Sequence, residues 1–125
     1  MRQHVLVAIA ASVLLSACAT ARPIPYAWGD YSSSLYKLKK DPSDENLRGH
    51  KQVLIQIIEN SKQQSMRVPP GVYAEYGYIV TKEGKTEEGM KYLDLEAETY
   101  PESKAFVERV KAQAIRSTTE KESKK

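Results

Sequence analysis

The stretch from Pro70 to Ser103 constrains the fold most, because its prolines and glycines favour two short helices joined by a tight turn. Pro70 suits the first turn of a helix, where a missing amide hydrogen is tolerated. Gly84 suits the left-handed residue that ends a helix, and Thr86 is a suitable N-cap for the next one. Pro101 then stops the second helix, because the residue before a proline resists helical geometry. Both helices have an apolar face at helical spacing, made by Val72, Tyr73, Tyr76, Ile79 and Val80 and then by Gly89, Met90, Leu93, Ala97 and Tyr100.

This order of helix, glycine turn, helix and proline resembles a tetratricopeptide repeat, an antiparallel helical hairpin of about 34 residues. Tyr73, Gly77 and Gly84 stand where the repeat has its first aromatic residue, its helix-crossing glycine and its turn glycine. Pro101 matches its terminal proline. Glu96 departs from the pattern, which has alanine there, and this predicts either an altered helix contact or an exposed site. An unrelated antiparallel hairpin is the alternative, since many helical hairpins follow the same rules.

One repeat cannot bury its own apolar face, so flanking helices must cover it. Residues 31–40 and 44–63 are predicted to be two helices that stack on it as a degenerate repeat. Ser103 is predicted to cap a closing helix with four inward residues, Phe106, Val107, Val110 and Ala114. The predicted fold of residues 31–116 is therefore all-α, a short right-handed stack of tetratricopeptide-like hairpins with about five helices. Residues 117–125 contain no apolar residue, so we expect a disordered tail.

The N-terminal residues predict export. Arg2 precedes an apolar run, Val5 to Leu15, of about the length expected for the core of a secretory signal. The run ends in the sequence Leu-Ser-Ala-Cys, which resembles the lipobox of bacterial lipoproteins at every position and ends at Cys18. The resemblance implies a signal peptide, residues 1–17, that is cleaved between Ala17 and Cys18.

The same resemblance implies that Cys18 carries an N-acyl group and an S-diacylglycerol group, which hold the chain at a membrane. There are two alternatives. One is an uncleaved transmembrane anchor, because His4 to Ala21 contains no residue charged at neutral pH. The other is an ordinary signal peptide with an unmodified Cys18. Ala19 directly after the cysteine resembles lipoproteins sorted to the outer membrane, so the expected location is the periplasm-facing side of that membrane.

Residues 18–30 are predicted to be a flexible tether between the lipid and the helical domain. Pro23 and Pro25 bias this segment toward extended conformations. Tyr26 and Trp28 have two interpretations. They suit a membrane interface, as amphipathic aromatic residues do, or they cap the open end of the helical core, which is the interpretation we favour.

Composition and residue inventory argue against nucleic-acid binding and against catalysis. Without Arg2, 18 basic residues stand against 16 acidic ones, a balance that does not suit nucleic acid. His50 is the only histidine after the signal, and it lies on or beside an apolar stripe, so a structural role is predicted. No spacing of cysteine, histidine and carboxylate residues suits zinc, and no glycine-rich phosphate loop is present. We therefore predict a protein that is not an enzyme and has no cofactor or metal.

The remaining class of function is recognition of another protein. In tetratricopeptide-like repeats, ligands commonly lie against the inner face of each first helix, and the matching positions are Ala74, Tyr78, Thr81 and Lys82. Tyr78 lies off the main apolar face, so it is predicted either to contact a partner peptide or to pack against the neighbouring hairpin.

Most of the mature chain resembles an uncharacterised family of small proteobacterial lipoproteins, whose members are typically found beside a lipoprotein similar to the curli secretion channel. The resemblance rests on the lipobox and on the segments YSSSLYKLKKDPS and PPGVYAEYGYIVTKEG. It implies an adaptor that binds another envelope protein in an assembly or secretion complex, that channel-like lipoprotein being one candidate. The alternatives are a passive structural lipoprotein, associated with the cell wall, and a pilotin-like chaperone of an outer-membrane channel.

Overall fold

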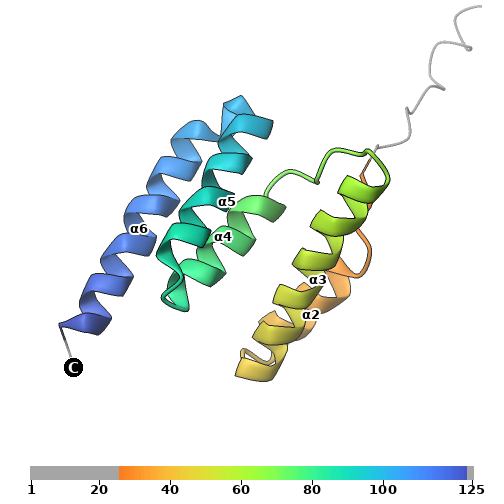
Figure 1. Ribbon diagram of the computed structural model, residues 1–125. Coiled ribbons are helices and arrows are strands. Elements are labelled where there is room, and N and C mark those ends of the chain that lie inside the picture. The colour runs from red at the N-terminus through yellow and green to blue at the C-terminus, as the bar shows by residue number, and fades with distance from the viewer. Residues whose placement is uncertain (1–25, 124–125) are drawn as a thin grey trace, which may run out of the picture.

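The computed structural model describes residues 26–123, and this part of the chain contains five α-helices and no strand (Figure 1). The all-α prediction is therefore confirmed. The predicted signal peptide, Cys18 and the tether up to residue 25 lie outside the described residues. The helices are α2 (Tyr31–Lys40), α3 (Asp44–Gln63), α4 (Val72–Lys82), α5 (Thr86–Thr99) and α6 (Lys104–Glu122), with a short 3₁₀ helix (Pro101–Ser103) between the last two.

The first hairpin has the predicted limits because its local signals agree. Ser43 caps α3, since its hydroxyl accepts a hydrogen bond from the backbone N–H of Asn46 at 3.3 Å. The β-branched run in the middle of α3 would also suit a strand, but its apolar residues fall on one helical face. Leu54, Ile57 and Ile58 are buried on that face, so burial of a helical stripe decides the conformation.

The turn between α4 and α5 forms as the sequence predicts. Gly84 has a φ of +93°, a conformation that suits glycine. Its N–H donates to the carbonyl of Thr81, and the N–H of Lys85 donates to the carbonyl of Val80, both at 3.0 Å. These two bonds make a Schellman motif, which satisfies carbonyls that the end of α4 would otherwise leave open.

Neither α4 nor α5 begins in the way that the sequence predicts. Pro70 does not open α4, because Pro69 to Val72 forms a turn closed by a bond from the N–H of Val72 to the carbonyl of Pro69. Gly71 takes the third position of this turn with a φ of +90°, as a type II turn requires. Thr86 is the first residue of α5 rather than its cap, and no side-chain capping bond forms there.

A glycine pair allows α4 and α5 to touch through their backbones. A β-carbon at Gly77 would lie 2.7 Å from the carbonyl oxygen of Gly89. Gly77 is thus the crossing glycine that the repeat pattern predicts. Leu93, fully buried, packs beside this crossing with Ala74 and with Val107 of α6.

Glu96 makes an altered helix contact, the first of the two alternatives for this position. Only 2% of it is exposed, and its carboxylate accepts backbone N–H groups of Gly71 at 2.8 Å and Ala74 at 3.4 Å. It therefore caps the N-terminus of α4 from the neighbouring helix, where the helix dipole favours negative charge. Burial raises the pKa of Glu96, and the backbone N–H bonds act in the opposite direction.

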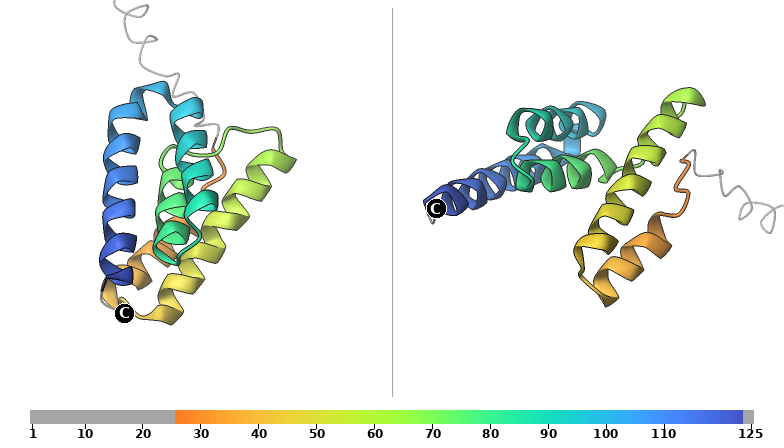
Figure 2. Two further views of the ribbon diagram at one scale, coloured as in Figure 1. Left: turned by 60° about the vertical axis from the view of Figure 1, so that its left-hand side comes forward. Right: turned by 60° about the horizontal axis from the view of Figure 1, so that its bottom comes forward.

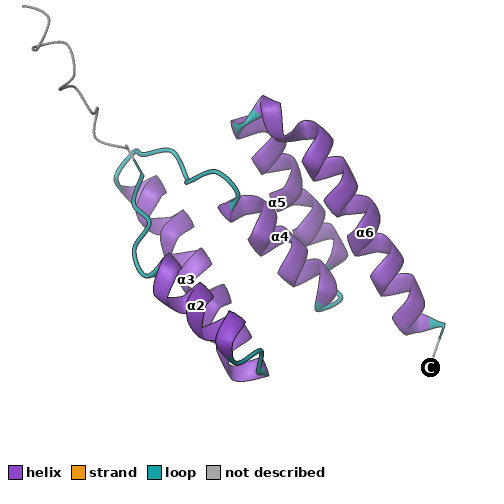
Figure 3. Ribbon diagram, turned by 180° about the vertical axis from the view of Figure 1, so that it is seen from behind, coloured by secondary structure: helices purple, strands orange, loops and turns teal. Residues whose placement is uncertain are grey.

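The hairpins and the closing helix α6 stack so that alternate helices share a face. In Figure 2, α2, α4 and α6 lie along one side of the domain, while α3 and α5 lie along the other. Helix α3 packs on α4, and α6 packs on both α4 and α5. Figure 3 shows α2 and α3 as one pair, joined by the loop before α4 to the group of α4, α5 and α6. The predicted short stack of antiparallel hairpins is confirmed.

The tail differs from its prediction, because α6 continues through Ser117 to Glu122. An existing helix is extended easily, since its costly first turn is already formed. The hydroxyl of Ser117 donates to the carbonyl of Ala114 at 2.8 Å, and that of Thr119 donates to the carbonyl of Ile115 at 3.1 Å. Absence of apolar residues therefore does not end this helix.

Candidate functional site

A groove of about 490 Å³ runs between the helices α2, α4 and α6. Its lining residues come from α4, from the start of α2 on one side and from α6 on the other. Most of its lining is apolar or aromatic, with one carboxylate and one amide. The lining residues are Tyr31, Gly71, Ala74, Glu75, Tyr78, Phe106, Val110 and Gln113.

Three of the four predicted contact residues lie along this face of α4, and one does not. Ala74 and Tyr78 line the groove. Tyr78 also lines an adjoining hollow of about 530 Å³ together with Lys82, whose Nζ lies 5.9 Å from the centre of the Tyr78 ring. Thr81 is fully buried, and its hydroxyl donates to the carbonyl of Gly77 at 2.8 Å. Thr81 therefore belongs to the α4–α5 contact and lies outside the groove.

Phe106 lines the groove, although its sequence position predicts an inward side chain. It is 50% exposed, whereas Val107 and Ala114 are fully buried and hold α6 against the other helices. Phe106 is one residue, or about 100° of helical turn, from Val107. The sequence contained a signal for this second face, because Phe106, Val110 and Gln113 have the spacing i, i+4, i+7.

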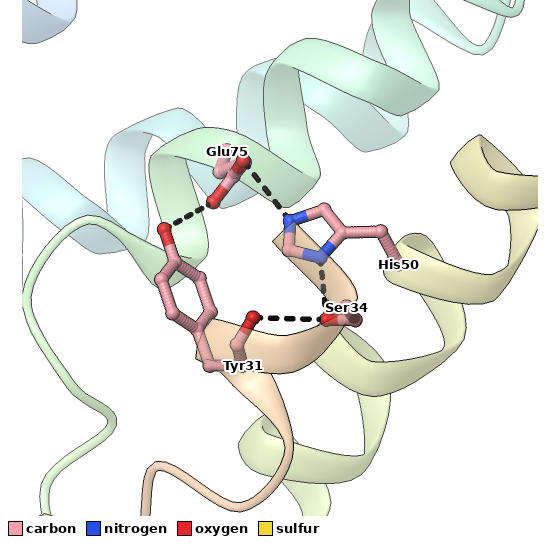
Figure 4. A network of polar contacts seen from close by, with 4 residues as sticks. All are labelled: Tyr31, Ser34, His50 and Glu75. Atoms are coloured by element: carbon pink, nitrogen blue, oxygen red, sulfur yellow. Dashed lines mark hydrogen bonds and ion pairs between the residues drawn. The ribbon is translucent and has the colours of Figure 1, made fainter. Parts of the chain in front are cut away.

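Four polar side chains connect the groove wall to the interior (Figure 4). The hydroxyl of Tyr31 donates to Oε2 of Glu75 at 2.8 Å. Oε1 of Glu75 lies 3.1 Å from Nε2 of His50, and Nδ1 of the same ring lies 2.7 Å from Oγ of Ser34. This network, made by Tyr31, Glu75, His50 and Ser34, joins α2, α3 and α4.

Proton counting relates the bonds of this network to one another. His50 is fully buried, and a neutral imidazole has one donor and one acceptor nitrogen. An ionised Glu75 accepts only, so Nε2 of His50 donates to it, and with a neutral ring Nδ1 accepts from Ser34. The Ser34 hydroxyl also lies 3.0 Å from the carbonyl of Tyr31, and its single hydrogen serves one of the two acceptors at a time. Burial raises the pKa of Tyr31 to about 12, and the hydrogen bond to Glu75 and its charge act in the same direction.

Ser34, His50 and Glu75 have the order of a nucleophile, a base and an orienting carboxylate, but their setting does not suit acyl transfer. Ser34 lies inside α2, where its own N–H donates to the carbonyl of Asp30 at 3.0 Å. An oxyanion site needs N–H groups that are not already bonded in this way. The arrangement therefore fixes the packing of three helices and the position of two groove residues, Tyr31 and Glu75.

The aromatic residues before α2 pack on the helical domain. The rings of Trp28 and Tyr31 meet edge to face at 5.2 Å, and those of Tyr26 and Trp28 at 6.4 Å. Burial raises the pKa of Tyr100, and the neighbouring Tyr26 acts in the same direction. These contacts support the interpretation that Tyr26 and Trp28 cap the core, and they place Trp28 against Tyr31, which lines the groove.

Between residues 26 and 123, no helix is both long enough and apolar enough to span a bilayer. The same residues contain no group of three or more histidine, cysteine or acidic side chains placed to hold a metal ion.

Comparison with known proteins gives one match. The chain matches no curated protein and no solved structure. The model of a family described as Domain of unknown function (DUF4810) matches residues 25–110, which include the groove floor and most of both walls. Because this match covers more than half of the sequence, the chain belongs to the family of the Domain of unknown function (DUF4810).

Proposed function

We propose that this protein is a lipid-anchored adaptor of the bacterial envelope, which binds a segment of a partner protein in the groove between α2, α4 and α6. The observation that carries the proposal is the lining of the groove. Three helices contribute to it, and Phe106, a large apolar residue, is left half-exposed there. Exposed aromatic side chains in a concave site are typical anchors of protein–protein contacts.

The anchor and the partner rest on the sequence. The lipobox that ends at Cys18 supports a lipoprotein, and Ala19 supports the outer membrane as its location. The resemblance to lipoproteins found beside a curli-secretion-channel-like lipoprotein supports an envelope protein of that kind as the partner. A short tether would then hold the groove close to the membrane in which such a partner resides.

Site-specific crosslinking in cells tests the groove. A photoreactive amino acid at Phe106 or Tyr78 is expected to crosslink to one envelope protein in stoichiometric amounts. The matched control is Tyr36, an aromatic residue of α2 that is 66% exposed and does not line the groove. Equal crosslinking from Tyr36 and Phe106, or crosslinking to cell wall alone, would contradict the adaptor.

Truncation of the same residues gives a quantitative test. Phe106→Ala and Tyr78→Ala are expected to weaken partner capture about 30-fold each, the loss of a typical anchor residue. Tyr36→Ala should leave capture unchanged. Incorporation of a labelled fatty acid into the wild type, but not into Cys18→Ser, tests the anchor separately, and a wild type without label would refute it.

A further inference from the structure

The groove continues into a second depression along the same side of α4. Tyr78 lines both the groove and the adjoining hollow of about 530 Å³, so the two meet at its side chain. Gly71, just before α4, lines the groove, and Lys82, the last residue of α4, lines the hollow. Eleven residues separate them, which corresponds to about 16 Å along an α-helix. The two depressions therefore extend over the whole length of α4.

The hollow adds apolar surface, and its charged residues already have partners. Leu47 and the ring of Tyr78 line it. Both carboxylate oxygens of Glu83 accept hydrogen bonds from Lys51, at 2.6 and 2.7 Å. Nζ of Lys82 lies 5.9 Å from the centre of the Tyr78 ring. We therefore assign the hollow no preference for a charged occupant.

The bordering helices offer few open backbone hydrogen-bond groups to an occupant. Residues 26–123 contain no strand, so they present no sheet edge with which a bound chain could pair. At the start of α4, the N–H groups of Gly71 and Ala74 donate to Glu96. At the start of α2, the N–H of Tyr31 donates to the carbonyl of Trp28 at 3.1 Å. An occupant must therefore satisfy most of its own backbone groups.

This requirement favours a helical occupant over an extended one. An extended segment that spans 16 Å has about five residues, and thus about ten backbone N–H and C=O groups. Those that face the apolar lining would leave water without gaining a partner, which costs free energy. An α-helix bonds its backbone groups internally and presents only side chains to the surface.

The size of the two depressions agrees with a helix. A helix of three turns, about 10 Å across with its side chains, occupies about 1,300 Å³. The groove of about 490 Å³ and the hollow of about 530 Å³ together hold most of this volume. The remainder corresponds to a polar face that stays in water.

One carboxylate gives the occupant an orientation. Glu75 is the one charged side chain among the residues that line the groove, and its side chain is 28% exposed. Its two oxygens each accept one hydrogen bond, from Tyr31 and from His50. A carboxylate has about four acceptor positions, so Glu75 can also accept a charge-assisted hydrogen bond from a basic side chain of the occupant.

We infer that the partner segment is an amphipathic helix of about three turns with a basic residue beside its apolar stripe. This inference rests on the proposed function of the groove. The apolar residues, at the spacing i, i+3 or i+4 and i+7, lie on Tyr78, Phe106 and Val110. The basic residue donates to Glu75.

Selection from a library of random displayed peptides tests the inference, with the full-length protein immobilised in detergent micelles. The enriched peptides are expected to have apolar residues at helical spacing and to become helical on binding, as circular dichroism can show. Proline at the centre of an enriched peptide should abolish binding, because it breaks a helix. The matched control is proline in the first turn, where a helix tolerates it. Glycine in place of a solvent-facing alanine should weaken binding about fivefold.

Variants of the protein locate the bound peptide. Tyr78→Ala and Phe106→Ala should each weaken its binding about 30-fold. Glu75→Gln should abolish the preference for a basic residue. Glu98→Gln is the matched control, because Glu98 is exposed on α5 and lines neither the groove nor the hollow.

Circular dichroism shows whether Glu75→Gln folds. If it does not, the same bond is tested from the peptide side with the wild-type protein. Replacing the basic residue of an enriched peptide by glutamine should weaken binding about tenfold, because a charge-assisted hydrogen bond is lost.

The outcomes separate the two proposals. Enriched peptides that bind without becoming helical, or that tolerate proline at the centre, overturn the inference. Helical peptides without a basic residue overturn the role given to Glu75. In both cases the groove function stands if binding still needs Tyr78 and Phe106. Peptides whose binding is unaffected by Tyr78→Ala and Phe106→Ala overturn both proposals. Absence of any enrichment overturns the helix inference, and the crosslinking experiment then decides the adaptor function on its own.

Discussion

Gly89→Ala changes the closest contact in the domain, where α4 crosses α5. A β-carbon at Gly89 would lie 1.8 Å from Oγ1 of Thr81 and 2.6 Å from the carbonyl oxygen of Gly77. Thr81 is fully buried and its hydroxyl is bonded to that same carbonyl, so it cannot move aside. The carbonyl belongs to the backbone of α4, so the two helices must separate.

Two opposing effects set the magnitude. Alanine is favoured over glycine inside a helix by about 1 kcal/mol, whereas an extra methyl group in a packed core costs about 1–3 kcal/mol. Two contacts below 3 Å, one of them to backbone, place Gly89 at the upper end of this range. The expected net loss of unfolding free energy is about 2 kcal/mol, which lowers the melting temperature of a domain of this size by about 8–16 °C.

Gly49 provides a matched control, because it lies in a helix with nothing within 4 Å of a β-carbon. Gly49→Ala should therefore stabilise the protein by about 1 kcal/mol and raise the melting temperature by about 4–8 °C. Thermal unfolding followed by circular dichroism measures both variants. A shift of both in the same direction, or an unchanged Gly89→Ala, would refute the close crossing.

Three further changes follow from other contacts. Ser61→Ala should raise the free energy of unfolding in urea by about 1 kcal/mol, since the buried hydroxyl of Ser61 has no hydrogen-bond partner among residues 26–123. Glu96→Gln should lower it by about 1 kcal/mol at neutral pH, because an amide has one acceptor oxygen for the two backbone N–H groups of α4. Burial raises the pKa of Glu96 above 4.5, so the part of the stability that is linked to its protonation is complete below pH 4.5 and is lost as pH rises through the raised value. Unfolding of Glu96→Gln should lack this dependence. Tyr31 and Tyr76 have pKa values raised from 10.0 to about 12 by burial and by hydrogen bonds to carboxylates, so stability should hold below pH 10 and fall toward pH 12. The Tyr31→Phe, Tyr76→Phe double variant should have a smaller alkaline step, because Tyr73 and Tyr100, whose pKa values burial also raises, remain; absorbance titration of tyrosinate can show this.

The helices were predictable because their signals are local. Ser43 caps α3, Gly84 ends α4 and Pro101 follows α5, and each acts within a few residues of itself. The wrong prediction that Pro70 opens α4 has the same origin. A proline followed by glycine suits both a helix start and a type II turn, and the fit of the loop between Val68 and α4 decides between them.

The candidate site was only partly predictable, because its key contacts join residues far apart in the chain. His50 was expected to be structural and is fully buried, yet its partners Ser34 and Glu75 are 16 and 25 residues away. No spacing within one helix predicts such a network. Thr81 shows the reverse problem. It lies on the same side of α4 as Ala74 by periodicity, but the missing side chain at Gly89 lets α5 cover it.

The network also explains how one groove can combine a fixed element with adaptable ones. Tyr31 and Glu75 are held by hydrogen bonds that continue into the fully buried His50. An occupant that binds Glu75 therefore meets a carboxylate already in place, and little conformational entropy is lost there on binding. Phe106 is half-exposed on the opposite wall and makes no such bond. In the proposed adaptor, Glu75 would therefore offer a fixed carboxylate to the partner, while Phe106 would adapt to the partner's shape.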